Sequence, residues 1–69
     1  MPICFAEMNV DLVIKEITGS DKIKQRLHEL GFVVGETVQV INKVNDSVII
    51  KIKGVSLAIS KELARRVMI

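Results

Sequence analysis

Apolar and polar residues alternate through the early part of the chain. The alternating run is Val10, Asp11, Leu12, Val13, Ile14 and Lys15. A period of two is typical of a β-strand with one face against a core. Val13 and Ile17 make the second face partly apolar as well. The pattern predicts a strand over residues 10–17, which ends at the turn residues 18–20.

The next segment changes to the period of a helix. Ile23, Leu27 and Leu30 are spaced i, i+4 and i+7, which places them on one stripe of a helix about three turns long. Ser20 is predicted to cap the helix at its start, and the acidic residue that follows suits the positive end of the helix dipole. Gly31 is predicted to end the helix, because glycine adopts the left-handed conformation without a Cβ penalty. We therefore expect a helix over residues 21–30.

Strand patterns return in the second half of the chain. We expect a strand over residues 37–43, a hairpin turn at 45–47 and a return strand over 48–53. The return strand would place Val48, Ile50 and Ile52 on its inner face, with Ile49, Lys51 and Lys53 on its outer face. Gly54 marks a further turn before a short strand over 55–59. A single helical turn over 60–64 and a last strand over 67–69 complete the prediction.

Five short strands and one short helix predict a mainly β fold. A flat sheet built from so few residues would expose long edges, so a small, bent and partly open barrel is expected. No repeat or linker divides the chain, and residues 1–69 are expected to form a single domain. The predicted core residues are Leu27, Leu30, Phe32, Val38, Val40, Val48, Ile50, Ile52, Leu57 and Val67.

Composition and charge limit the classes of function. The chain has 69 residues, is 49% hydrophobic and carries a formal charge of +2 with both signs interleaved. This balance gives no support to nucleic-acid binding. Cys4 is the only cysteine, so no internal disulfide forms and a reducing, cytoplasmic compartment is expected. We expect neither a signal peptide nor direct insertion into a membrane.

Several short motifs together resemble a known family. They are Arg26-Leu27, Leu30-Gly31-Phe32, Gly35, Gly54, Leu57-Ala58-Ile59, Glu62-Leu63-Ala64 and Val67-Met68-Ile69. In this order and spacing the chain resembles the FeoA family of bacterial ferrous iron transport accessory proteins, over nearly its whole length. The resemblance implies an SH3-like barrel in the cytoplasm and a partnership with FeoB, the membrane protein that carries Fe(II) inward and bears a cytosolic GTPase domain. The same domain also occurs as an interaction module fused to metal-dependent repressors.

The chain departs from the family pattern in two places. Asn9 and Leu12 stand where the family usually enters its first strand through glycines. Asn tolerates a left-handed conformation, whereas Leu12 implies a different local path. The loop at residues 44–46 is also shorter than the usual hairpin loop of the family, so a partner that contacts this loop would meet a different surface here.

Metal-binding chemistry is sparse in this sequence. Cys4 and His28 are the only soft ligands, and Glu29 is the carboxylate beside His28. These three are the candidate metal ligands, but their spacing matches no closed metal site. Neighbours on a helix point about 100 degrees apart, so His28 and Glu29 would not chelate one ion without help. Cys4 is interpreted as a small buried hydrophobe. No cofactor is required, and weak binding of Fe(II) or another transition metal stays open.

Catalytic patterns are absent from the sequence, so we expect no enzyme. No glycine-rich loop leads into a helix, and only His28 is available as a base for a nucleophile. The prediction is a non-catalytic protein of ferrous iron uptake that binds the cytosolic side of FeoB. A metal sensor or regulatory module and a nucleic-acid-binding barrel are the alternatives. Candidate contact residues are Lys24, His28, Glu29, Val33, Val34, Lys51 and Lys53. For Lys51 and Lys53, edge protection and solubility form the competing interpretation.

Overall fold

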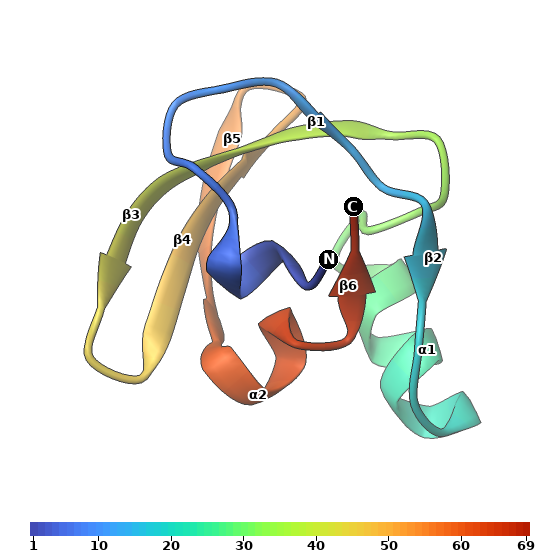
Figure 1. Ribbon diagram of the computed structural model, residues 1–69. Coiled ribbons are helices and arrows are strands. Elements are labelled where there is room, and N and C mark those ends of the chain that lie inside the picture. The colour runs from blue at the N-terminus through green and yellow to red at the C-terminus, as the bar shows by residue number, and fades with distance from the viewer.

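The strands of the computed structural model form two small antiparallel sheets, and all residues from 1 to 69 are described (Figure 1). The larger sheet has the order β1-β3-β4-β5, and the smaller pairs β2 with β6. In chain order the elements are the 3-10 helix η1 (Ile3–Phe5), β1 (Leu12–Val13), β2 (Glu16–Ile17), α1 (Asp21–Glu29), β3 (Thr37–Val44), β4 (Ser47–Ile52), β5 (Val55–Ser60), α2 (Lys61–Ala64) and β6 (Val67–Met68). The predicted mainly β, bent and partly open barrel is confirmed.

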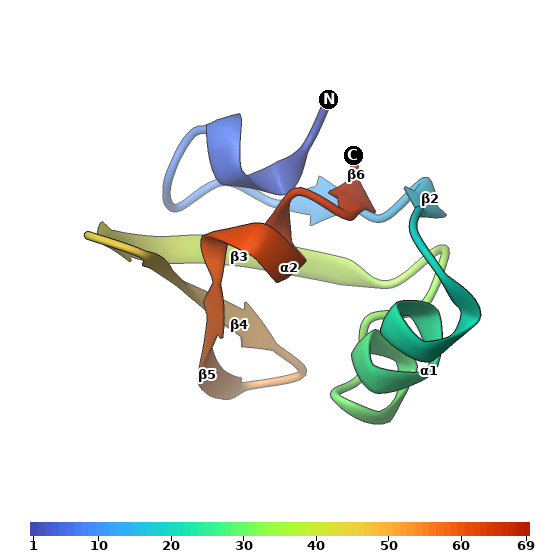
Figure 2. The same cartoon turned by 90° about the horizontal axis from the view of Figure 1, so that it is seen from below.

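The larger sheet curves, and η1, α2 and β6 lie together on one side of it (Figures 1 and 2). The core lies between these layers. It contains Ile3, Cys4, Ala6, Ile14, Leu27, Phe32, Val38, Val40, Val48, Ile50, Ile52, Ile59, Ala64 and Val67. Eight of the ten predicted core residues are in this set, while Leu30 is 38% exposed and Leu57 is only half-buried. Three core residues at the start of the chain close the barrel, and of these only Cys4 was predicted to be buried.

The strand predicted over residues 10–17 is wrong in one respect, because the chain changes sheets in the middle of it. Leu12 of β1 pairs with Val38, whereas Glu16 of β2 pairs with Met68. Between them Ile14 is buried, and its N–H donates to the Glu36 carbonyl at 3.0 Å. The alternation in sequence is that of a strand, but a corner at Ile14 lets one segment close two sheets. This split raises the strand count to six.

Helix α1 begins and ends as the sequence predicts. The Ser20 hydroxyl accepts a hydrogen bond from the Ile23 N–H at 3.3 Å, which caps the start. Gly31 has a φ of +103°, its N–H donates to the His28 carbonyl, and the N–H of Phe32 donates to the Leu27 carbonyl. These two bonds form a Schellman motif, which joins a hydrophobic residue after the helix to one in its last turn. Phe32 therefore fills the core beside α1, and Leu30 is left at the surface.

This geometry separates two leucines of the predicted stripe. Replacing Leu30 by alanine is expected to cost under about 1 kcal/mol, because the side chain is already more than a third exposed. Replacing the fully buried Leu27 should cost about 2–5 kcal/mol. Urea unfolding of both variants measures the difference. Equal losses of unfolding free energy would contradict the assignment of Leu30 to the surface.

Two tight hairpins fix the order β3-β4-β5. Val44 pairs with Ser47, so the predicted hairpin is present with a turn at 45–46 that is one residue shorter than expected. Ile52 pairs with Val55 across the turn formed by Lys53 and Gly54. Both residues of the second turn have positive φ, +51° and +81°, which is the pattern of a type I′ turn. A type I′ turn has two central residues, and here they are Lys53 and Gly54. Lys53 therefore lies in a turn, not on the outer face of a strand as predicted.

Candidate interaction surfaces

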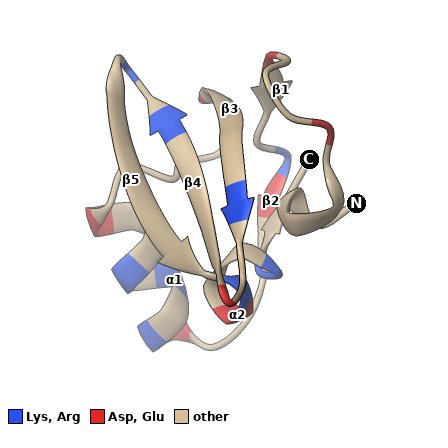
Figure 3. Cartoon of the chain, turned by 90° about the vertical axis from the view of Figure 1, so that its left-hand side faces the viewer, with Lys and Arg blue, Asp and Glu red and all other residues tan.

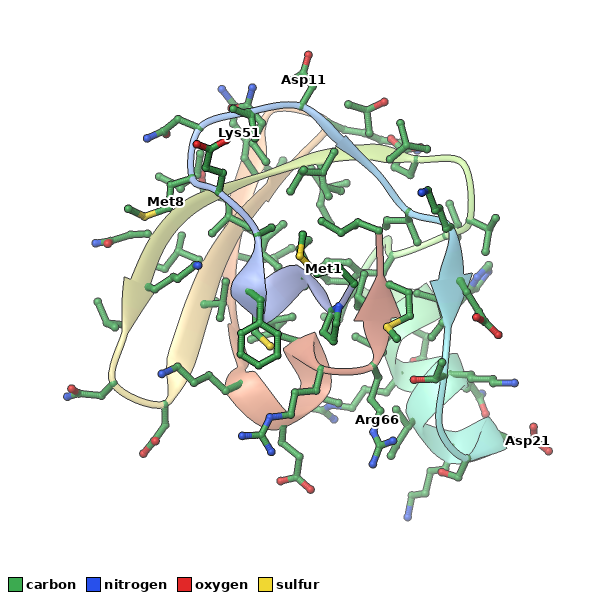
Figure 4. All side chains as sticks on the ribbon, in the orientation of Figure 1. Met1, Met8, Asp11, Asp21, Lys51 and Arg66 are labelled. Carbon is green, nitrogen blue, oxygen red and sulfur yellow. The ribbon has the colours of Figure 1, made fainter.

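The residues predicted as contact sites do not form one surface. Lys51 lies at one end of the molecule and Asp21, at the start of α1, lies at the opposite end (Figure 4). Lys24, His28 and Glu29 belong to α1 and share its end of the molecule. The predicted set therefore divides into a helix group, a turn group and a strand group.

The helix group itself occupies two sides of α1. Lys24 and His28 are four residues apart and share one side of the helix. Glu29 lies on the other side, where it lines a shallow depression of about 420 Å³ with Lys22, Ile23, Gln25 and Arg26. All three predicted residues are exposed. His28 and Glu29 thus present separate surfaces, as expected of helix neighbours.

The turn group consists of Val33 and Val34. Val34 is 64% exposed, whereas Val33 is half-buried. The N–H of Gly35 donates to the Ile14 carbonyl at 2.8 Å, and the N–H of Glu36 donates to the Val33 carbonyl at 3.1 Å. The turn is thereby held against Ile14, the residue that follows β1, and within the turn Val34 offers the exposed apolar side chain to a partner.

The strand group lies at the other end of the barrel. Lys51 and Lys53 line a depression of about 160 Å³ together with Asp11, Thr37, Val38, Gln39 and Gly54. Within it the Gln39 amide donates to an Asp11 carboxylate oxygen at 2.7 Å. The two lysines are exposed and close together, as a small basic site would need.

Charged residues are spread over several elements (Figure 3). Basic segments lie on α1, on α2 and toward the ends of β3 and β4, with acidic residues between them. A depression of about 420 Å³ beside α2 shows the same mixture, since Asp46, Ser60, Lys61, Glu62, Arg65 and Arg66 line it. No continuous basic face is formed.

The candidate metal ligands lie on different elements. Cys4 belongs to η1 and is buried, which confirms its interpretation as a packed hydrophobe. His28 and Glu29 are exposed on α1. No three His, Cys, Asp or Glu side chains of the chain gather closely enough to hold a metal ion together.

One apolar surface was missed by the sequence reasoning. Residues 1–8, here called the N-terminal cap, cross the open side of the barrel from β6 to β3, with Pro2 bridged to Met68 and Met8 bridged to Val40. Phe5 is 68% exposed, Met1 60% and Met8 45%. Met1 and Met8 are labelled at the two ends of this segment in Figure 4. The signal available in the sequence was the apolar run at residues 3–6, which follows neither a strand nor a helix period.

Hydrogen bonds hold this cap in place at several points. The Met1 amino group donates to the Ile69 carbonyl at 3.0 Å, and the Ile69 N–H donates back to the Met1 carbonyl at 2.8 Å. The Lys43 ammonium donates to the Ala6 carbonyl at 2.7 Å. The Lys43 amine thus ties the cap to β3.

The Lys43 contact leads to a testable expectation. A Lys43→Met variant keeps most of the aliphatic stem and loses the charged donor, so it should cost about 1 kcal/mol or somewhat more. Amide hydrogen exchange should quicken at Phe5 and Ala6, whose N–H groups bond within the cap. Lys51→Met is the matched control and should leave these rates unchanged. Equal exchange in both variants would show that Lys43 does not hold the cap.

Comparison with known proteins decides the family. The FeoA domain model matches residues 1–69, which is the whole chain. The chain belongs to the FeoA family. Membership places it among proteins of ferrous iron transport. The Fe(2+) transport protein A of Methanocaldococcus jannaschii is 34% identical over 68 residues, which span 99% of this FeoA chain and 83% of the relative.

Solved structures agree with this assignment. A crystal structure of an iron uptake regulatory protein, FeoA, has a TM-score of 0.90 and 32% identity, with 99% of this chain and 92% of that chain covered. The zinc complex of Stenotrophomonas maltophilia FeoA, described as a prokaryotic SH3 domain protein, has a TM-score of 0.83 and 26% identity, with 99% and 87% covered. The SH3-like character of the FeoA barrel is thus confirmed. None of its helices combines the length and apolar composition that a membrane crossing needs.

Proposed function

We propose that this chain is a non-catalytic accessory protein of ferrous iron uptake, which binds the cytosolic part of an FeoB membrane transporter. Support comes from its membership in the FeoA family and from relatives named for ferrous iron transport. The zinc-bound relative is described as a candidate activating factor for that transport. The proposed role needs no resident metal in this chain.

The exposed N-terminal cap is the observation that carries the proposal. A partly open barrel of this size has no enclosed site, so a partner must be recognised on its surface. Phe5, Met1 and Met8 expose large apolar side chains on one short segment. Aromatic residues and methionine are enriched at protein interfaces, and clustered exposed apolar groups mark sites of association. The hydrogen bonds of the cap keep the segment in one conformation, which lowers the entropy cost of binding.

Iron uptake in cells tests the role. Cells that lack this protein are complemented with the wild-type chain or with the Phe5→Ser variant, and uptake of radioactive Fe(II) is measured at equal protein abundance. Wild type should restore uptake, and Phe5→Ser should restore it only partly. Val13→Ser is the matched control, because Val13 is an exposed apolar residue on β1 outside the cap.

Two outcomes separate the parts of this proposal. Uptake that is unchanged when the protein is deleted would contradict the accessory role itself. Full rescue by Phe5→Ser together with failure of Val34→Ser would instead assign the contact to the turn after α1. The lysine and helix groups are tested in the same assay by Lys51→Ala and Lys24→Ala.

A further inference from the structure

Strand β5 forms an open edge of the larger sheet. In the order β1-β3-β4-β5 it pairs only with β4, and its other side has no strand beside it. Figure 3 shows β5 at the margin of the sheet. Apart from the pairing with β4, the backbone groups of residues 55–59 make no hydrogen bond to other backbone groups. The outward backbone groups of β5 are therefore available to a further strand.

The hairpin geometry identifies which groups these are. In a two-residue hairpin the closing pair exchanges hydrogen bonds, and the exchange then recurs at every second pair. Ile52–Val55, Ile50–Leu57 and Val48–Ile59 are thus the bonded pairs of the β4–β5 register. The N–H and C=O groups of Ser56 and Ala58 point the other way, toward the open edge. Their side chains are small and exposed, so a second backbone can approach.

This edge lacks the usual protection against strand pairing. Natural edges carry a charge, a proline or a bulge. The sequence of β5 is Val-Ser-Leu-Ala-Ile-Ser, with no charged residue and no proline. Its register with β4 runs without a shift from Ser47–Ser60 to Ile52–Val55, so no bulge twists the edge away. Such an edge is suited to the addition of an extended segment.

The charges at the two ends of β5 determine which kind of partner strand can bind to its edge. Lys53 lies in the turn just before β5, and Lys61 lies just after it. Beside Lys61, the depression at α2 carries Arg65 and Arg66 balanced by Asp46 and Glu62, so Lys61 leaves one positive charge in excess there. The strand itself is neutral. A segment with acidic residues at both ends and an uncharged centre complements this pattern.

A second copy of the chain fits less well. Pairing Ser56 with Ala58 of the other copy, and the reverse, uses the outward groups of these two residues and places Leu57 opposite its counterpart. The same antiparallel register then brings the end of β5 that carries Lys53 in each copy close to Lys61 of the other, and like charges that lie close together destabilise the pair. A six-residue edge, about 20 Å long, is also far smaller than the surface of a stable dimer.

We propose that the free edge of β5 binds an extended segment of another protein, about six residues long, that carries Asp or Glu at both ends and adds a strand to the sheet through Ser56 and Ala58. This site is distinct from the N-terminal cap, which lies across β3, two strands away. It does not depend on FeoB as the partner.

A designed peptide tests the site directly. The probe is a capped peptide of three Thr-Val repeats between two pairs of Glu, titrated into the ¹⁵N-labelled full chain. The largest amide shifts and the strongest protection from exchange should fall on Ser56 and Ala58. Two control peptides carry either Lys in place of Glu or N-methyl groups on alternate amides. Both should bind at least about fivefold more weakly, through lost charge attraction or lost hydrogen bonds.

A matched pair of variants separates the backbone from the side chain. Ala58→Pro removes the outward N–H, and an edge strand tolerates this change. Ala58→Ser keeps the N–H. Binding should weaken about fivefold or more in the first variant and stay unchanged in the second. The amide spectrum outside β5 shows whether Ala58→Pro is folded, and if it is not, the N-methylated peptide supplies the same test.

Several results would overturn the proposal. These are shifts that fall away from β5, no shifts at millimolar peptide, and equal binding of the N-methylated peptide. If the Lys-flanked peptide bound as tightly as the Glu-flanked peptide, the requirement for acidic residues at both ends would be refuted. Self-association of the free chain that Ala58→Pro abolishes would assign the edge to a second copy instead.

Discussion

Replacing Phe32 by alanine is expected to remove about 3–5 kcal/mol from the free energy of unfolding. Phe32 is fully buried, and the Schellman motif at the end of α1 holds its backbone in place beside Leu27. The chain has only two aromatic residues, and its core has 14 members. Few neighbours are able to move into a cavity of this size. Since domains are stable by only about 5–15 kcal/mol, this loss is a large part of the stability of the domain.

Chemical denaturation followed by circular dichroism measures this loss. Phe5→Ala is the matched control, because it deletes the same atoms from a side chain that is 68% exposed. It should change the unfolding free energy by no more than about 1 kcal/mol. Comparable losses in the two variants would contradict the opposite placement of the two phenylalanines.

A substitution at the exposed Phe5 is expected to give the second large effect. Phe5→Ser is expected to weaken binding to the cytosolic part of FeoB about thirtyfold or more, as for an interface residue worth about 2 kcal/mol. The reason is the loss of the only exposed aromatic ring of the chain. The stability of the variant should be close to that of the wild type, which distinguishes a contact residue from a core residue.

Isothermal titration calorimetry of the full chain with the FeoB cytosolic part provides the measurement. Val13→Ser is the control for the loss of an exposed apolar side chain, and it should leave the affinity unchanged. An affinity of Phe5→Ser within twofold of wild type, with the protein folded, would remove the N-terminal cap from the interface.

Local signals in the sequence predicted most of the β3-β4-β5 hairpins and the limits of α1. Ser20 and Gly31 act on neighbouring backbone groups, so their roles can be read from a few adjacent residues. The alternation from Val48 to Ile52 likewise reports burial on one face of a strand. These features depend on short-range geometry, and the structure confirms them.

The sequence pattern could not reveal contacts between residues that are far apart in the chain. The split at Ile14 depends on partners at Glu36 and Met68, which the local alternation cannot reveal. Leu30 continues the helical spacing, yet the turn at Gly31 returns Phe32 to the core in its place. Ile3 and Ala6 are buried because the chain crosses the open side of the barrel, and no local period marks that crossing.

The contact residues were predicted from charge and from exposed turns, and this explains why they lie on separate surfaces of the molecule. Lys24 and Lys51 are exposed as expected, but they lie on elements at opposite ends of the barrel. An apolar segment near a terminus was assigned no role, since its exposure depends on which of its residues face the core. Phe5 lies between the buried Cys4 and Ala6 and points outward.

Binding of FeoB through the N-terminal cap is tested most directly by an amide titration. The ¹⁵N-labelled chain is titrated with the cytosolic part of FeoB from the same organism, with and without Fe(II) and guanine nucleotide, and Fe(II) alone is added in a separate series. The account predicts shifts centred on residues 1–8 and the neighbouring residues of β3 whenever FeoB is present. No shifts with FeoB, or shifts confined to α1 or to the edge of β5, would contradict it.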